Sequence, residues 1–462
     1  MAKTPFSYIP LLMGILLISA CQPSTPGLTP SAIPITAISR PRPTATPIPI
    51  STLDVEEDDL KGIEIEVWHP WFGAPAALFD LQVEEFNKEN PWGITVSAAY
   101  QGSYNMLFNM VTDALDTPQG PDVVVALSEQ ISVWDEADSI TDLAPYITDP
   151  IWGMTVIEQA DFPRIFIEQD QRETTWLALP AQRTSQFLIY NQSWGEELGF
   201  DAPPLKFEEF EEQACAANQF MRSDDDLDND GKGGWIVDFD SSGVLSWMVG
   251  FEGGPFVNEE YQFISSQNIN AFSGLKKLYD NQCAWLSTAE TPYEQFAGRS
   301  ALFITASMEE FDEISRSFLT LGSHDEWTVI PFPGEKKGAL VVYGSSFAIL
   351  ETEDAEALAS WLFVKWMLEP HNQTRWVKST ALFPLRESSL DELAEYKKGH
   401  PQWAEAVDLI SQAEIQPKLP SWHRVRYLLG DGFEYIYRFD SGAGSVAAIL
   451  AHMNEAARAL SD

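Results

Sequence analysis

Hydrophobic and polar positions follow two different periods at the start of the folded chain. Residues 63–68 read IEIEVW, where isoleucine and valine alternate with glutamate, the period of a strand with one buried face. After the loop HPWFGAP, the segment AALFDLQVEEFNKEN places Leu78, Leu81 and Phe86 on one helical stripe. The pattern therefore predicts a strand followed by an amphipathic helix.

The same alternation continues downstream. ITVSAAY predicts a second strand, SYNMLFNMVTDAL a second helix, and PDVVVAL a third strand. The last of these is a continuous apolar run, typical of a parallel strand buried on both faces. Strands that alternate with helices in this way predict βαβ units and an α/β lobe.

An open sheet of this kind binds ligands outside the carboxyl ends of its strands. The residues that follow the three predicted strands are therefore candidates for a binding rim. They are His69, Trp71, Tyr104, Ser128 and Glu129.

A second group of elements follows. An apolar strand is predicted at residues 187–190 and leads into helices. The carboxyl third contains the apolar segments GRSALFITAS, EWTVIPFPG and GALVVYGSSFAIL. The helix TEDAEALASWLFVKWMLEP places Leu358, Trp361, Leu362 and Trp366 on one face. About 400 residues exceed what one hydrophobic core usually serves, which predicts two lobes.

The order of these segments resembles the extracellular solute-binding proteins of ABC importers, in particular the carbohydrate-binding, maltose-binding-protein-like group. The matching pieces include VWHPWFGAPAALFDLQVEEFNKENP, GPDVVVA, LPAQRTSQFLIYNQSWGEELGFDAPP, FAGRSALFITAS and VVYGSSFAIL. The resemblance implies an α/β fold of two lobes with a ligand between them, hinge crossovers, and delivery to a membrane permease. It also implies that residues 62–169 and 292–332 form the first lobe, and residues 170–291 and 333–462 the second.

The N-terminus predicts export. An apolar run of about 12 residues after Lys3 is too short to span a membrane and has the shape of a signal peptide at residues 1–20. The run ends in Ile-Ser-Ala-Cys, which resembles a bacterial lipobox and predicts lipidation of Cys21. The alternative is an ordinary signal peptide with an incidental cysteine.

Residues 21–61 predict an anchor and linker. The stretch from 22 to 52 is rich in proline, serine and threonine and has no aromatic residue, so it lacks the apolar surface that folding requires. We therefore expect an exported protein held at the cell membrane by an N-terminal lipid, facing the extracellular or periplasmic side.

The net charge excludes some classes of binding partner. The chain has 69 acidic and 28 basic residues and a net charge of −41. This excludes the electrostatics of a nucleic-acid binder and disfavours both anionic lipid surfaces and highly anionic ligands. We expect a monomer whose partners are a carbohydrate and the permease.

Carbohydrates need aromatic rings against their apolar faces and planar polar groups around their hydroxyls. The resemblance implies further ligand contacts at Arg183, Trp247, Met308, Glu309, Tyr343, Gly344 and Trp422. Arg183 has an alternative role as the partner of a neighbouring acid. Half of the 16 tryptophans are equally well explained as core residues.

The segment DLDNDGKGGW resembles the front half of an EF-hand calcium loop. The predicted ligands of a structural calcium are Asp226, Asp228, Asp230 and the carbonyl of Lys232, with Asp238 as the completing carboxylate and Asp224 or a distant residue as the alternative. The pattern departs from the motif at its last position, which is Val237. The alternative is an acidic surface turn.

The remaining cysteines, Cys215 and Cys283, form an even pair in an oxidising compartment. A disulfide between them closes a long loop and is worth roughly 4 kcal/mol in the chain-entropy model. The alternative is two buried thiols.

No catalytic motif is present: the sequence has no G-x-S-x-G, no H-E-x-x-H and no P-loop. We therefore expect a carrier that is not an enzyme and requires no cofactor. The alternative is a lipid-anchored glycoside hydrolase or lyase, because chance pairs of acids are unavoidable in so acidic a chain.

Overall fold

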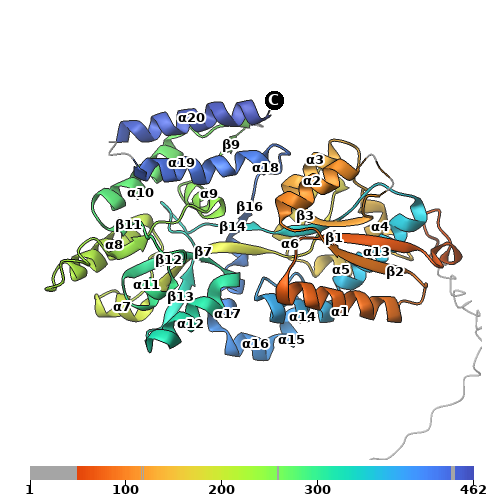
Figure 1. The fold of residues 1–462 in the computed structure, drawn as a ribbon, viewed down its shortest axis with the longest axis horizontal. Coiled ribbons are helices and arrows are strands. Elements are labelled where there is room, and N and C mark those ends of the chain that lie inside the picture. Colours follow the sequence, from red (N-terminus) through yellow and green to blue (C-terminus); the bar gives the residue numbers. More distant parts are fainter. Residues whose placement is uncertain (1–48, 116, 118, 258–259, 439–442, 462) are drawn as a thin grey trace, which may run out of the picture. The chain divides into compact units, whose positions relative to one another are not determined.

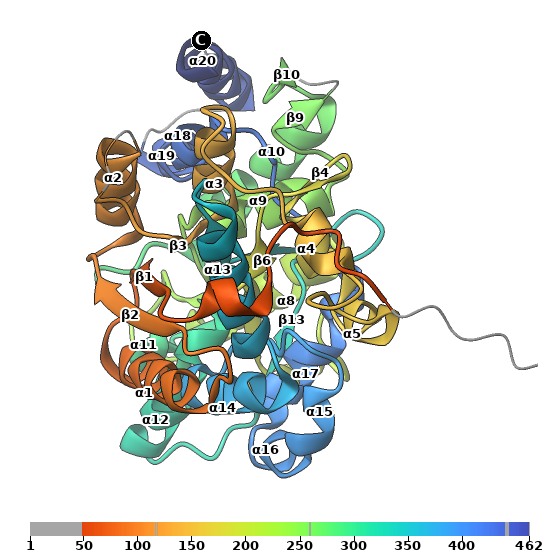
Figure 2. The ribbon, with the colours of Figure 1, turned by 90° about the vertical axis from the view of Figure 1, so that its right-hand side faces the viewer.

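The computed structural model describes residues 49–115, 117, 119–257, 260–438 and 443–461. Within this part of the chain, two β-sheets are each flanked by helices on both faces (Figures 1 and 2). The predicted α/β architecture is confirmed. Cys21 and the signal peptide lie outside the described residues. None of the described helices is both long enough and apolar enough to cross a membrane.

The first sheet has five strands in the order β2, β1, β3, β15, β6. Their bounds are β1 (Glu64–His69), β2 (Thr95–Tyr100), β3 (Val123–Leu127), β6 (Leu179–Pro180) and β15 (Ser345–Ile349). β1 is parallel to β2 and β3, as predicted, whereas β15 is antiparallel to β3 and β6. The carboxyl ends of β1, β2 and β3 therefore lie along one edge.

Helices cover both faces of this sheet. They are α1 (Gly73–Glu89), α2 (Tyr104–Ala114), α3 (Ser128–Asp135), α4 (Ala144–Thr148), α5 (Val156–Ala160), α6 (Arg164–Glu168), α13 (Asp354–Met367) and α14 (Pro370–Thr380). The strand alternation explains the layers. Ile65 and Val67 pack with α1 and α13 on one face, and Trp68 packs with α2 and α3 on the other.

The second sheet has seven strands in the order β11, β8, β12, β7, β14, β16, with β13 also paired to β7. Their bounds are β7 (Thr184–Asn191), β8 (Gly233–Ile236), β11 (Ala284–Trp285), β12 (Ala301–Ser307), β13 (Trp327–Ile330), β14 (Leu340–Tyr343) and β16 (Ala413–Ile415). β7 is buried along its whole length and is antiparallel to β12, β13 and β14.

The remaining helices belong mostly to this second sheet. They are α7 (Gln192–Glu197), α8 (Phe207–Met221), α9 (Ser241–Gly250), α10 (Ser266–Asp280), α11 (Tyr293–Ala297), α12 (Phe311–Leu321), α17 (Pro401–Asp408), α18 (Trp422–Val425), α19 (Tyr427–Arg438) and α20 (Ala443–Ser461). The short helices α15 (Ser389–Glu392) and α16 (Ala394–Gly399) precede α17. The fold also contains three short 3-10 turns, which are η1 (Glu57–Leu60), η2 (Met308–Glu310) and η3 (Ile410–Gln412). Two small two-stranded sheets complete it. One pairs β4 (Gln171–Arg172) with β5 (Thr175–Trp176), and the other pairs β9 (Phe256–Val257) with β10 (Glu260–Tyr261).

The strand pairing corrects the predicted lobe boundaries. Residues 292–332 were assigned to the first lobe, but β12 and β13 hydrogen-bond to β7 in the second sheet. Conversely, β15 pairs with β3 in the first sheet, although residues 333–462 were assigned to the second lobe. Apolar strands from either lobe have the same composition, so only their hydrogen-bonded partners distinguish them.

Two crossover segments run side by side where the chain passes between the sheets. One links β6 to β7 through Gln182, and the other links β14 to β15 through Gly344. The N–H groups of Ala181 and Gln182 both donate to the carbonyl of Ser345, at 2.9 and 3.1 Å. Gly344 has φ +151°, and a Cβ there would lie 2.1 Å from the carbonyl oxygen of Gln182. Glycine at this position is therefore required by the close approach of the two crossovers.

A disulfide joins Cys215 on α8 to Cys283, 68 residues later, with a Cα–Cα distance of 4.4 Å. The predicted pairing is confirmed. The bond fixes the loop after α10 against α8, at the outer end of the second sheet.

Candidate functional site

The carboxyl-end edge of the first sheet carries a chain of side-chain hydrogen bonds. The indole Nε1 of Trp71 donates to Oε1 of Gln182 at 2.8 Å, and Nε2 of Gln182 donates to the hydroxyl of Tyr104 at 3.1 Å. Tyr104 is half-buried at the start of α2, where Ser103 caps the helix. Desolvation raises the pKa of Tyr104, and the negative charge of Glu309 from the second lobe adds to the shift. Tyr104 therefore lies where the two lobes meet.

Two other rim candidates are mainly core residues. His69 is only 2% exposed, and its ring packs edge-on against Phe79 with centroids 5.0 Å apart. Burial lowers the pKa of His69 to about 4, so the ring is neutral near pH 7. The ring of Trp71 packs against Phe347 and Trp376, and its contact with the site is the hydrogen bond from Nε1–H to Gln182. The prediction that both rings contact ligand directly is corrected by this packing.

The rim residues at the start of α3 make contacts within the protein. The hydroxyl of Ser128 donates to Asp170 at 2.7 Å, so it is already used. Glu129 lies 3.3 Å from Nε of Arg426, a residue between α18 and α19 of the second lobe. These two predicted ligand contacts are therefore a buried structural hydrogen bond and an ion pair between the lobes.

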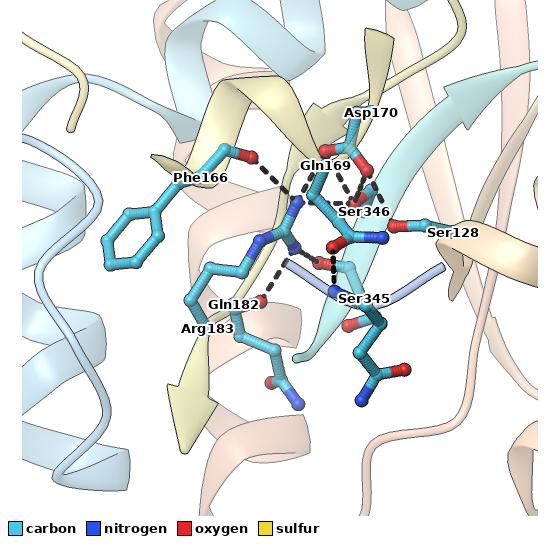
Figure 3. A network of polar contacts seen from close by, with 9 residues as sticks. Ser128, Phe166, Gln169, Asp170, Gln182, Arg183, Ser345 and Ser346 are labelled. Carbon is cyan, nitrogen blue, oxygen red and sulfur yellow. Dashed lines mark hydrogen bonds and ion pairs between the residues drawn. The ribbon is translucent and has the colours of Figure 1, made fainter. Parts of the chain in front are cut away.

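Arg183 is fully buried, and all of its hydrogen-bond partners belong to the protein (Figure 3). Its Nη2 bonds to the carboxylate of Asp170 at 2.5 Å and to the carbonyl of Phe166 at 3.1 Å, while its Nη1 donates to the carbonyl of Ser345 at 2.7 Å. The hydroxyl of Ser346 completes the cage around Asp170. The alternative in which Arg183 pairs with a neighbouring acid is the one observed, and the ligand role is corrected.

The second sheet presents polar side chains at the end nearest the crossovers. On the face covered by α9, where Leu188 and Phe303 lie deeper in the core, the strand ends carry Thr184, Gln186, Thr305, Ser307 and Tyr343. We call these five residues the polar sheet end. Nε2 of Gln186 donates to the hydroxyl of Tyr343 at 3.2 Å. The hydroxyls of Thr184 and Thr305 are buried without a hydrogen-bond partner.

Four carboxylates border the polar sheet end: Asp238, Asp240, Glu309 and Glu310. We call them the acidic wall. Asp238 follows β8, Asp240 caps α9 through the N–H groups of Ser242 and Gly243, and the glutamates belong to η2 after β12. The parallel strands β8 and β12 both lead toward this edge, and β12 extends beyond the level at which β8 ends at Ile236.

The pKa values of these groups reflect desolvation and mutual repulsion. Desolvation raises the pKa of Asp238 to about 7, and the charge of Asp240 adds to the shift. Glu309 keeps contact with solvent, but desolvation by surrounding side chains raises its pKa, followed by the effect of Glu310. The pKa of Tyr343 is raised by desolvation and then by Asp240, Glu309 and Glu310. Glu309 and Tyr343 therefore remain candidates for ligand contact.

Three predicted contacts lie in the core. Trp247 is 1% exposed on α9 and packs against Phe210, Trp235 and Phe332, with the Phe332 ring centroid 5.1 Å away. Trp422 is equally buried, and its Nε1 donates to Gln416 at 3.0 Å. Met308 is also inaccessible. Each prediction is corrected because these segments are packed helix turns rather than open loops.

Gly344 is likewise explained by the crossover geometry given above rather than by ligand contact. Sequence reasoning missed Gln182, Gln186 and Asp240, which lie among the site residues. It also missed Phe72 and Tyr100, which follow and end β1 and β2 and are 76% and 56% exposed. Their position at or just after the ends of predicted strands is the sequence signal that identifies them as rim residues.

Hydrogen bonds within the protein hold the segment of the predicted calcium loop. The carboxylate of Asp226 accepts a hydrogen bond from the N–H of Asp228, and the side chain of Asn218 occupies the carbonyls of Asp230 and Lys232. Asp238 belongs to the acidic wall. Across the described residues, no three His, Cys, Asp or Glu side chains are grouped to hold a metal. Calcium stays a prediction from the motif, and no role is assigned to it.

A cavity of about 930 Å³ lies at the opposite edge of the first sheet. It is lined by Glu64 and Thr95, which begin β1 and β2, and by Asp122, Glu351 and Glu356. Because ligands of parallel sheets bind at the carboxyl ends of the strands, this cavity is separate from the candidate site.

Comparison with solved structures identifies the fold. The chain is similar to the sugar-binding protein MalE from Xanthomonas citri (TM-score 0.73, 17% identity, 86% of this chain and 98% of that chain covered). It is also similar to the cyclic alpha-maltosyl-1,6-maltose binding protein from Arthrobacter globiformis (TM-score 0.69, 17% identity, 86% and 99% covered). UgpB from Mycobacterium tuberculosis, solved with glycerophosphocholine, gives a TM-score of 0.68 at 16% identity, with 86% and 98% covered.

These similarities establish the two-lobed periplasmic-binding-protein fold. No match was found among curated proteins. Residues 82–408 match the family model described as bacterial extracellular solute-binding protein. The match covers more than half of the chain, and the observed sheets agree with it. The chain therefore belongs to the family of bacterial extracellular solute-binding proteins.

Proposed function

We propose that this protein captures a mono- or oligosaccharide between its lobes and delivers it to an ABC permease. The observation that carries the proposal is the meeting of two polar strand edges at the crossovers: Gln182 and Tyr104 from one side, Gln186 and Tyr343 from the other. Amides and phenol hydroxyls both donate and accept, as sugar hydroxyls require. Two structurally similar proteins, one a sugar-binding protein and the other a cyclic alpha-maltosyl-1,6-maltose binding protein, support this reading.

The rings available for stacking are exposed Phe72 and Tyr100 rather than the buried tryptophans. Closure around the ligand would bend the two crossovers, since few other segments connect the sheets. The contacts between Glu129 and Arg426 and between Asn105 and Tyr427, the latter at 3.1 Å, would form or break with this movement.

The family is extracellular, and we propose that lipid on Cys21 holds the protein at the membrane beside its permease. Replacing Cys21 by alanine should release the protein from the membrane fraction or block its processing. Normal anchoring of this variant would contradict the proposal, and secretion without any fatty-acid label on wild type would support an ordinary signal peptide.

The binding function is tested by calorimetry and thermal shift with mono- and oligosaccharides. A bound sugar should raise the melting temperature by mass action, because it binds only the folded protein. Tyr343→Phe should weaken binding while leaving the unliganded melting temperature unchanged. The proposal fails if no saccharide binds the wild-type protein.

Glycoside hydrolysis is the second candidate function. Asp238, with its pKa raised to about 7 near Asp240 and Glu310, has the protonation state of a general acid at neutral pH. Incubation of the purified protein with each bound oligosaccharide distinguishes the two: intact ligand supports the carrier, and product formation that is lost in Asp238→Asn supports the enzyme.

A further inference from the structure

Among the described residues, no ion pair neutralises the four carboxylates of the acidic wall, although Asp240 caps α9 and Glu310 accepts hydrogen bonds from the hydroxyl of Tyr293 and the N–H of Ser307. The groups that raise the pKa of Asp238 besides desolvation are Asp240 and Glu310, and for Glu309 the added influence is again Glu310. Among the described residues, no lysine or arginine forms an ion pair with either carboxylate. The two arginines already described at the junction are paired elsewhere, Arg183 with Asp170 and Arg426 with Glu129.

A second, independent feature points to a missing ligand. Thr305 is only 7% exposed, and its buried hydroxyl has no hydrogen-bond partner. Its side chain lies beside the wall. A Cβ atom added at Gly243 would lie 3.6 Å from Cγ2 of Thr305 and 3.8 Å from Oδ1 of Asp238. The hydroxyl of Thr184, paired in register with Tyr343 across β7 and β14, is buried and unpartnered as well. Buried hydroxyls without partners are costly unless a ligand completes them.

From these observations we infer that the site is selective for a hydroxylated ligand bearing an ammonium group, such as an amino sugar. The inference rests on the proposed carbohydrate function and adds the charge of the ligand. A neutral sugar would desolvate the acidic wall on closure without neutralising it, which costs free energy. An ammonium group supplies the opposite charge, and the sugar hydroxyls supply partners for the two threonines.

The spacing of the carboxylates favours an organic cation over a metal ion. The wall extends from the end of β8 to η2 after β12, and within the described part of the chain its members do not converge into a metal site. An ammonium group on a sugar ring contacts one or two carboxylates while the ring spans the rest.

The test uses sugars that are matched except for charge. Glucosamine, galactosamine and the β-1,4-linked glucosamine dimer are compared by calorimetry with glucose, galactose and cellobiose, which carry a hydroxyl in place of each amine. We expect at least one amino sugar to bind about tenfold or more tightly than its neutral counterpart, and added salt to reduce this preference.

Charge-neutral variants locate the effect. Asp240→Asn retains a good helix cap for α9 while removing the charge, and Glu309→Gln keeps the side-chain shape. Each should lower the affinity for the amino sugar about tenfold and change the neutral counterpart less than about threefold. Glu89→Gln, an exposed position at the end of α1, changes the net charge equally and should have no effect.

The outcomes separate the two proposals. Neutral sugars that bind as tightly as their amino counterparts overturn the charge inference and leave the carbohydrate function standing. A preference that survives both Asp240→Asn and Glu309→Gln overturns the assignment to the acidic wall. If no saccharide of either kind binds, both proposals fail, and binding of spermidine alone would mark a polyamine site instead.

Discussion

Two groups of buried and half-buried charges lie within the same junction and are arranged in opposite ways. Around Arg183, every charge has a partner: Asp170 accepts from the guanidinium and from the hydroxyls of Ser128 and Ser346 (Figure 3). In the acidic wall, no described lysine or arginine forms an ion pair with Asp238 or Glu309, and the neighbouring charges that raise their pKa values belong to other acids. The network around Arg183 pairs each charge with its opposite and holds the crossovers in place, although Nε of Arg183 itself has no hydrogen-bond partner. The carboxylates of the acidic wall have no such counter-charge among the described residues. Completeness of pairing therefore separates architecture from binding in this protein.

The largest expected effect on stability comes from removing the carboxylate that pairs with Arg183. Asp170→Asn leaves the guanidinium of Arg183 buried without a counter-charge and should lower the free energy of unfolding by about 3 to 5 kcal/mol. Denaturant unfolding measures it. Ser346→Ala removes a hydroxyl that donates to the same carboxylate and accepts from Nη2 of Arg183, and it should cost less, about 1.5 to 3 kcal/mol. A loss below about 1 kcal/mol in Asp170→Asn would show that the pair is not what fixes the crossovers.

The contrast between buried and exposed rings predicts the next effect. Trp247→Ala removes a packed core ring and should destabilise the second lobe by about 3 to 5 kcal/mol. Phe72→Ala removes an exposed ring, so it should leave unfolding nearly unchanged and weaken sugar binding. If Trp247→Ala instead melts like wild type and loses binding, the ring contacts ligand and its assignment to the core is wrong.

Removing a charge from the acidic wall should stabilise the folded protein, whereas removing the charge of Asp170 should destabilise it. The folded-state pKa of Asp238 is about 7 against an ordinary value of 3.8, so the folded protein binds more protons between these values. Stability therefore falls as pH rises through this window, and the charges of Asp240 and Glu310 and the hydroxyl of Tyr293 face the same carboxyl.

Asp238→Asn abolishes this loss and keeps an acceptor for the N–H of Asp240. Its melting temperature should exceed that of wild type by a few degrees at about pH 8, and the difference should vanish near about pH 4. Melting curves across this range measure it. Equal melting temperatures at every pH would show that Asp238 ionises as freely in the folded protein as in the unfolded chain.

The smallest expected effect concerns a neutral group. Tyr343→Phe removes one hydroxyl that bonds to Gln186 and should lower sugar affinity about three- to tenfold, the value of one hydrogen bond. Tyr146→Phe, in the core of the first lobe, is the matched control and should bind normally. Unchanged affinity in Tyr343→Phe would place the ligand elsewhere on the polar sheet end.

Much of the fold was predictable from local pattern. The alternation in IEIEVW, the apolar run in PDVVVAL and the stripe between them predicted β1, β3 and α1 and their parallel arrangement. The cysteine pairing was predictable by elimination within an exported chain. The lobe boundaries were not, because β12 and β15 are both short apolar strands and differ only in the partners that they find.

The site was predictable in part. The rule that ligands bind at the carboxyl ends of strands named Tyr104, while Glu309 and Tyr343 came from the family resemblance. All three lie in the candidate site, and their contact with a ligand stays a prediction. The rule could not separate Trp247 from Phe72, since both are aromatic residues near predicted loops. Their exposed fractions, 1% and 76%, depend on which helices pack above them.

The sequence by itself determined the α/β class, the strands and helices, the exported character and the excess of negative charge, because period, composition and charge are local or additive properties. Only the tertiary structure decided which charges are neutralised. Asp170 and Asp238 are chemically identical in the sequence. One lies within reach of Arg183, and the other lies after a strand, where the neighbouring charges are those of Asp240 and Glu310. Pairing depends on distances between segments far apart along the chain, and those distances are set by the packing of the two sheets.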